Sequence, residues 1–189
     1  MKEKISMLVF VIFLGTISAG LLVGINSYTT PKVLKNKELK IKSSILAVLS
    51  IEYSKNEISE TFAQNIEIIK KDNAVFYRSK NNEIVFEFSG SGLWGPISGV
   101  IALNPDLKTI KGIKITHQEE TPGLGGRISE KEFLDGFKDK NIFQKSLAIV
   151  KGKASKDYEV DGITGATMTC KAFEDIINKN IKKFTELAK

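Results

Sequence analysis

Apolar residues follow three different patterns along the chain, and the first is one long run at the N-terminus. The run extends from Ile5 to Ile25, and no charged residue lies between Lys4 and Lys32. About 20 apolar residues are enough to span a bilayer as a helix. We therefore expect a transmembrane anchor over residues 1–30. A cleaved signal peptide is the alternative, with small residues at Ser18–Gly20, but apolar residues continue beyond that point.

The second pattern is helical spacing, and it covers residues 31–72. One run extends from Val33 to Ile51 after Pro31. A further piece, 57–70, places Phe62, Ile66 and Ile69 at intervals of four and three residues. The spacing predicts a juxtamembrane helical segment between the anchor and the rest of the chain.

The third pattern is alternation, which begins near residue 73. The stretches "AVFYRS", "EIVFEFSG", "ISGVIALN", "TIKGIKITHQ" and "SLAIVKG" alternate or are wholly apolar, and the turn-forming stretches "KNN", "GSGLWGP" and "NPDLK" lie between them. Helical spacing returns at 130–138 and 166–188. The pattern predicts an α+β fold: one N-terminal transmembrane helix, then a single domain, 73–189, with a mainly antiparallel sheet flanked by helices.

Composition excludes several classes of site. The 189 residues include one cysteine, Cys170, and one histidine, His117. An internal disulfide is therefore impossible, and a zinc or iron–sulfur cluster has too few ligands. The net charge is +6, but many of the lysines lie in the juxtamembrane run and the final helix, and no nucleic-acid motif accompanies them. We expect no metal, no catalytic acid–base pair and no nucleic-acid partner.

Small and hydroxyl residues gather in "DGITGATMTC", Asp161 to Cys170, just before the last predicted helix. Thr164 can cap that helix, and glycines leave bulk out of its entrance. The first-turn N–H groups then form a site for a phosphate, with the Thr167 hydroxyl beside it. A capped helix after a tight turn is the alternative that these residues alone leave open.

Three motifs together resemble a known family. "DGITGAT" is similar to the flavinylation motif Asp-x-x-Ser/Thr-Gly-Ala-Thr of the FMN-binding domain, which the sodium-pumping NADH:quinone reductase and the Rnf complex each carry in one of their subunits. "ETPGLGG", Glu120 to Gly126, resembles a second signature, and "GSGLW", Gly90 to Trp94, resembles a loop of the quinone-reductase version. The chain length is nearer to that of the Rnf version, so the subfamily stays open.

The resemblance implies FMN linked through a phosphoester to Thr167 rather than to Thr169. It also implies a set of cofactor-binding residues around the phosphate, the ribityl chain and the ring. This set comprises Asp161, Gly162, Ile163, Thr164, Gly165, Ala166, Met168 and Thr169 of the third motif, Leu93 and Trp94 of the first, and Glu120, Thr121, Gly123, Leu124 and Gly125 of the second.

The implied function is electron transfer within a membrane complex. The expected partners are other membrane subunits, the bilayer, and a flavin transferase that uses FAD and a divalent metal outside the cytoplasm. Five lysines between Lys32 and Lys42 favour a cytoplasmic domain by the positive-inside rule, but whole domains translocate largely regardless of charge. We therefore expect the FMN domain on the extracytoplasmic side. A free-standing flavoprotein and a non-redox binding module are the alternatives.

Overall fold

The computed structural model describes residues 2–71, 74–143 and 145–188. The predicted boundary between residues 72 and 73 therefore lies outside the described residues. The chain divides into two compact units, the first ending at Leu39 and the second beginning at Lys40. Helix α1, Lys2–Val48, contributes to both units, and Pro31 lies inside it.

The first unit consists of the apolar part of α1. Its most apolar 18-residue window has a mean hydropathy of 2.6, and no residue of that window is buried. By length and composition this helix can cross a membrane. Whether it is retained as an anchor stays a prediction.

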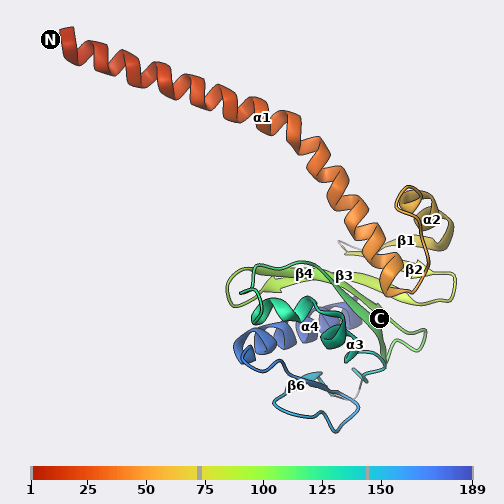
Figure 1. The fold of residues 1–189 in the computed structure, drawn as a ribbon. Helices are drawn as coiled ribbons and strands as arrows, with labels where there is room; N and C mark the ends of the chain where they lie inside the picture. The colour runs from red at the N-terminus through yellow and green to blue at the C-terminus, as the bar shows by residue number, and fades with distance from the viewer. Residues whose placement is uncertain (1, 72–73, 144, 189) are drawn as a thin grey trace. The chain divides into compact units, whose positions relative to one another are not determined.

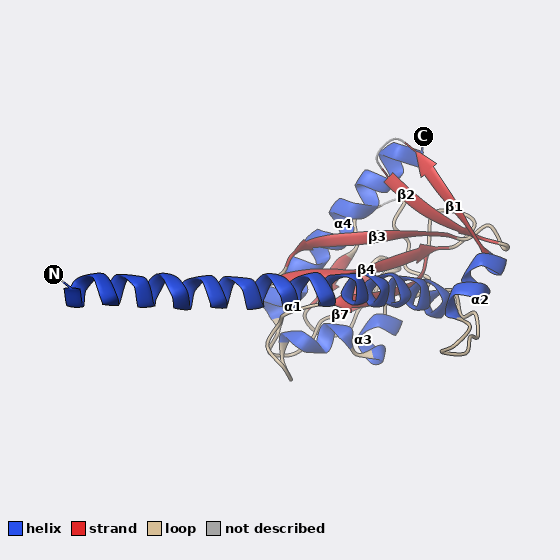
Figure 2. Cartoon of the chain, turned by 90° about the horizontal axis from the view of Figure 1, so that it is seen from above, coloured by secondary structure: helices blue, strands red, loops and turns tan. Residues whose placement is uncertain are grey.

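The second unit is built on a five-stranded antiparallel sheet with the order β1-β2-β3-β4-β5 (Figure 1). Each strand pairs with the next along the chain, and the view from above shows β1 to β4 side by side (Figure 2). The strands are β1 Ile66–Lys71, β2 Ala74–Ser79, β3 Ile84–Ser91, β4 Pro96–Leu103 and β5 Ile110–His117. The predicted α+β class is confirmed.

Helices cover both faces of this sheet. One face packs against α4, Thr167–Ala188, where the Phe184 ring stacks on Phe86 with centroids 4.7 Å apart. The other face packs against the end of α1, where Ile45 and Leu46 are fully buried, and against Phe62 of α2, Ile58–Asn65. A sheet that is buried on both faces needs apolar residues in succession. This explains why β4 is a nearly continuous apolar run.

The remaining elements lie at the edge of the sheet and below it. They are the 3₁₀ helix η1, Gly125–Ser129, the short helix α3, Lys131–Asp135, and a two-stranded parallel sheet of β6, Ala148–Val150, and β7, Glu159–Asp161. β7 leads directly into the segment before α4. The sheet thus delivers the third motif to the start of that helix.

One predicted element was wrong in part. The helix expected over 57–70 ends at Asn65, and Ile66–Lys71 forms strand β1, which pairs in register with β2. In β1, Ile66 packs on the α1 side of the sheet and Ile69 packs on the α4 side. β-Branched residues suit such a two-faced strand, and tertiary pairing therefore outweighs the helical spacing.

Candidate functional site

Thr167 is the first residue of α4 and its side chain is exposed. Gly165 has a φ of +83°, which turns the chain two residues earlier, and the Ala166 N–H donates to the Ile163 carbonyl at 3.1 Å. The N–H groups of a helix's first turn lack intrahelical acceptors, so an anion placed beside Thr167 would meet them. The expected Thr164 cap was wrong: α4 begins after the Gly165 turn, and within residues 145–188 no hydrogen bond joins the Thr164 side chain to it.

A single buried carboxylate joins the three motifs. Oε1 of Glu120 accepts hydrogen bonds from the backbone N–H groups of Leu93, at 2.7 Å, and Trp94, at 3.1 Å. Oε2 accepts from the Thr169 hydroxyl at 2.6 Å. Glu120 is 4% exposed and Thr169 is 2% exposed. Segments separated by 26 to 49 residues in sequence therefore meet at one side chain.

Two glycines leave the space that this junction occupies. A Cβ at Gly92 would collide with Oε1 of Glu120. A Cβ at Gly125 would lie 2.6 Å from the Thr169 hydroxyl and 2.9 Å from Oε2 of Glu120. Glycine is thus required at both positions by close approach, because any side chain would occupy the place of the carboxylate or its partner.

Large apolar side chains remain exposed around the junction. Leu93, Trp94, Leu124 and Met168 are 45%, 71%, 47% and 65% exposed. The Leu124 side chain lies 3.3 Å from the point where a Cβ of Gly165 would be, so the second loop reaches the turn before α4. Exposed apolar side chains that gather on one face indicate a binding surface. This face fits the flat ring expected there.

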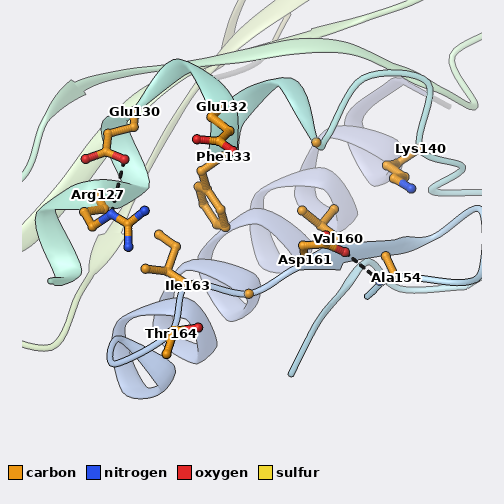
Figure 3. Close-up of a pocket in the computed structure, with 12 residues that line it drawn as sticks. Arg127, Glu130, Glu132, Phe133, Lys140, Ala154, Val160, Asp161, Ile163 and Thr164 are labelled. Atoms are coloured by element: carbon orange, nitrogen blue, oxygen red, sulfur yellow. Dashed lines mark hydrogen bonds and ion pairs between the residues drawn. The ribbon is translucent and has the colours of Figure 1, made fainter. Parts of the chain in front are cut away.

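A cleft of about 510 Å³ lies on the other side of the third motif (Figure 3). Ile163 and Thr164 line it from the segment before α4, and Arg127 and Glu130 line it from η1 and its end. Arg127 is paired with Glu130 at 3.2 Å. The Asp161 carboxylate also lines the cleft and accepts a hydrogen bond from the Ala154 N–H at 2.6 Å. Asp161 therefore holds the loop that follows β6.

Cys170 and His117 play no part in this arrangement. Cys170 is buried, and burial raises the pKa of its thiol, as expected for an unreactive core residue. His117 is exposed and lies 3.1 Å from Glu119 on the surface. A third residue, Gln118, was not anticipated from the sequence: its side-chain oxygen accepts from the Glu120 N–H at 2.6 Å. Nothing local in the sequence indicates that contact.

The structure separates the predicted site residues into two groups. Exposed residues can touch a ligand: Leu93, Trp94, Thr121, Gly123, Leu124, Asp161, Thr164, Gly165, Thr167 and Met168. Buried ones support the site: Glu120, Gly125, Ile163, Ala166 and Thr169, with Gly162 half-buried. Gly123, with a φ of +72°, forms the turn of the second loop. The roles of these residues toward a cofactor stay predictions.

Comparisons with known proteins agree with this site. A family model of the FMN-binding domain matches residues 92–182. The NqrC subunit of the Na⁺-translocating NADH-quinone reductase of Haemophilus ducreyi is 37% identical over 101 residues, which are 51% of this chain and 39% of that protein. The same subunit of Vibrio anguillarum is 32% identical over 137 residues, with 62% of this chain and 54% of that protein covered. The chain thus spans well under two thirds of the length of these relatives.

Solved structures show the same fold. The NqrC subunit from Parabacteroides distasonis superposes with a TM-score of 0.72 at 28% identity, and the match covers 80% of this chain and 92% of that one. The NqrC structure of Shewanella oneidensis has a TM-score of 0.69 at 21% identity, with 74% and 89% covered. Over residues 92–182 this chain belongs to the FMN-binding domain family, and it resembles the NqrC subunit of the Na⁺-translocating NADH-quinone reductase.

Proposed function

We propose that this chain is a membrane-anchored electron carrier whose FMN is linked by a phosphoester bond to Thr167. It acts as a redox subunit of an ion-translocating complex of the NADH:quinone reductase type. The observation that carries the proposal is the position of Thr167, an exposed hydroxyl on the first residue of a 22-residue helix. A phosphate esterified there meets first-turn N–H groups and the positive end of the helix dipole.

The surrounding residues fit the rest of the cofactor. Leu124, with its side chain near the Gly165 turn, and Met168, beside Thr167 in sequence, offer apolar contacts at the attachment point. Leu93 and Trp94 belong to a loop tied through Glu120 to the same helix. An aromatic and aliphatic face of this kind suits an isoalloxazine ring, and the exposure of these side chains leaves the ring accessible to a partner.

The cofactor would supply the electron-transfer chemistry, while the protein binds and orients it. The exposed face then serves for exchange with neighbouring subunits, and no acid–base residue is needed in the chain. The relatives are by name subunits of a reductase, which supports partners in the membrane. Because these relatives are NqrC proteins, the quinone-reductase type is favoured over the Rnf type.

The proposed location is the cell membrane, with α1 as a single span and the FMN domain on the extracytoplasmic side. A flavin transferase that attaches FMN would have to reach Thr167 there. The apolar window of α1, with none of its residues buried, supports the anchor. The side of the membrane rests on the resemblance alone.

The test is the colour of the protein after unfolding. The full chain is produced with a flavin transferase, purified in detergent, denatured and passed through a desalting column. We expect a yellow protein fraction with flavin absorbance, since a phosphoester survives unfolding. A colourless fraction, from cells in which a known substrate of the same transferase becomes yellow, would favour a non-redox binding module instead.

A further inference from the structure

The Glu120 carboxylate touches all three motifs and is itself almost fully buried. We propose that Glu120 is a positioning residue: it holds Thr167 and the Trp94 loop in the arrangement that flavin attachment requires, without touching the flavin. This inference rests on the proposed attachment at Thr167. It assigns Glu120 and Thr169, which the sequence places among the cofactor-binding residues, to a supporting role.

The two threonines at the start of α4 point in different directions. Thr167 and Thr169 are two residues apart, which is about 200° around a helix. Thr167 is therefore exposed while Thr169 points inward and donates to Oε2 of Glu120 at 2.6 Å. This bond fixes the first turn of α4 against the second loop, and with it the direction of the Thr167 hydroxyl.

The other carboxylate oxygen holds a different segment. Oε1 accepts the N–H groups of two successive residues, Leu93 and Trp94, and so holds the tip of the first loop. The Leu93 and Trp94 side chains stay exposed, because only their backbone is engaged. One side chain thus sets the position of the attachment residue and of the apolar loop independently, through different oxygens.

The neighbouring carboxylate shows what a surface residue of this loop looks like. Glu119 has a side chain that is 56% exposed, and it pairs with His117. Glu120 instead has both oxygens engaged by groups from two other segments. Gly92 and Gly125 leave the room for it. The site is therefore built around this carboxylate rather than merely containing it.

Conservative variants separate position from charge. In Glu120→Gln, the amide oxygen can accept the two N–H groups and the amide nitrogen can donate to the Thr169 hydroxyl, so the geometry is retained. Glu120→Ala removes all three bonds. Thr169→Val removes only the bond to α4, and Thr169→Ser keeps it. Glu119→Ala is the matched control for loss of a neighbouring carboxylate.

The experiment measures two properties of the full chain in detergent. The first is the initial rate of covalent flavin attachment with FAD, a divalent metal and the transferase, followed by intact mass. The second is the fluorescence anisotropy of Trp94, the only tryptophan in the sequence, before flavin is added. Folding of each variant is checked by circular dichroism.

We expect Glu120→Ala to lower both the attachment rate, by about tenfold or more, and the Trp94 anisotropy. Misplacing a reacting group by ~1 Å can cost about 10²-fold in rate, which sets this scale. Thr169→Val lowers the rate but leaves the anisotropy unchanged, because the bonds to Leu93 and Trp94 remain. Glu120→Gln, Thr169→Ser and Glu119→Ala stay within about twofold of wild type, a difference of under ~0.5 kcal/mol.

Two outcomes overturn the inference. One is a Glu120→Ala protein with wild-type rate and anisotropy. The other is a Glu120→Gln protein as slow as Glu120→Ala, because charge rather than position would then matter. If Glu120→Ala fails to fold, the pair Thr169→Val and Thr169→Ser decides: equal rates refute the role of the bond to α4. A wild-type chain that accepts no flavin refutes the proposed function instead, so the two failures are distinguishable.

Discussion

Gly125→Ala tests whether the junction between the second and third motifs is as tightly packed as the structure has it. The added Cβ would lie 2.6 Å from the Thr169 hydroxyl, 2.9 Å from Oε2 of Glu120 and 3.0 Å from its Cβ. The hydroxyl and the carboxylate are buried and joined to each other at 2.6 Å. Neither can withdraw into solvent without breaking that bond.

The expected cost follows from two contributions. Overpacking a well-filled site costs about 1–3 kcal/mol. Leaving a buried hydrogen-bonding group unpaired costs about 1–3 kcal/mol. One displacement relieves part of both, so we expect a loss of about 2–4 kcal/mol in the free energy of unfolding, from the lower halves of these ranges. At ~2–4 °C per kcal/mol for a unit of this size, the melting temperature falls by about 5–15 °C.

Gly126→Ala is the matched control. Its Cβ would meet the Thr121 carbonyl oxygen at 3.3 Å and the Gln118 amide nitrogen at 3.4 Å, contacts that small shifts can relieve. Neither Gly125 nor Gly126 has a positive φ, so the loss of glycine's freedom in the unfolded chain stabilises both variants alike. Thermal unfolding of the full chain in detergent, followed by circular dichroism, gives the comparison. Equal melting temperatures for the two variants would refute the tight packing at Gly125.

Three further predictions concern other parts of the molecule. Cys170 is buried and its pKa is raised by that burial, so we expect alkylation near pH 8 to be slow in the folded chain and fast after unfolding; equal rates would contradict its place in the core. The Ser155 N–H, with Lys156 beside it, lowers the pKa of Glu159 from 4.5 to about 2. A lowered pKa stabilises the fold above the ordinary value and is lost as the pH falls, so the melting-temperature advantage of wild type over Glu159→Gln is full above pH ~5 and disappears toward pH 2; an advantage that is constant over this range would show that the carboxylate is not the source. External protease is expected to digest the domain in intact spheroplasts, and alkaline phosphatase fused to the C-terminus is expected to be active; a protected domain with an inactive fusion would place it in the cytoplasm.

Much of the sheet was predictable because its strands carry their own pattern. The stretches that became β2 to β5 alternate or are wholly apolar between turn residues, and α4 places its apolar residues on one side. Strand β1 was misassigned because Phe62, Ile66 and Ile69 follow helical spacing, although Phe62 ends in a helix and the other two in a strand. β6 and β7 have only three residues each, too few for any period to be read.

The site could be located from the sequence but not assembled. The three motifs identified the segments, and the Thr167 hydroxyl falls at a helix start as its small neighbours indicated. The shared role of Glu120 depends on contacts across 26 to 49 residues, which no local pattern encodes. The expected Thr164 cap failed for a related reason: the positive φ of Gly165 moves the helix start to Thr167.

The central claim is the phosphoester bond between FMN and Thr167, and peptide mapping tests it most directly. The full chain is produced with a flavin transferase, digested, and analysed by mass spectrometry beside a Thr167→Ala chain produced in the same way. We predict that the peptide containing Thr167 carries the mass of an FMN phosphoester in wild type. The variant stays folded, because alanine is a good helix former, and carries no covalent flavin on any peptide. FMN found on another residue, or still attached to the Thr167→Ala chain, would contradict the account.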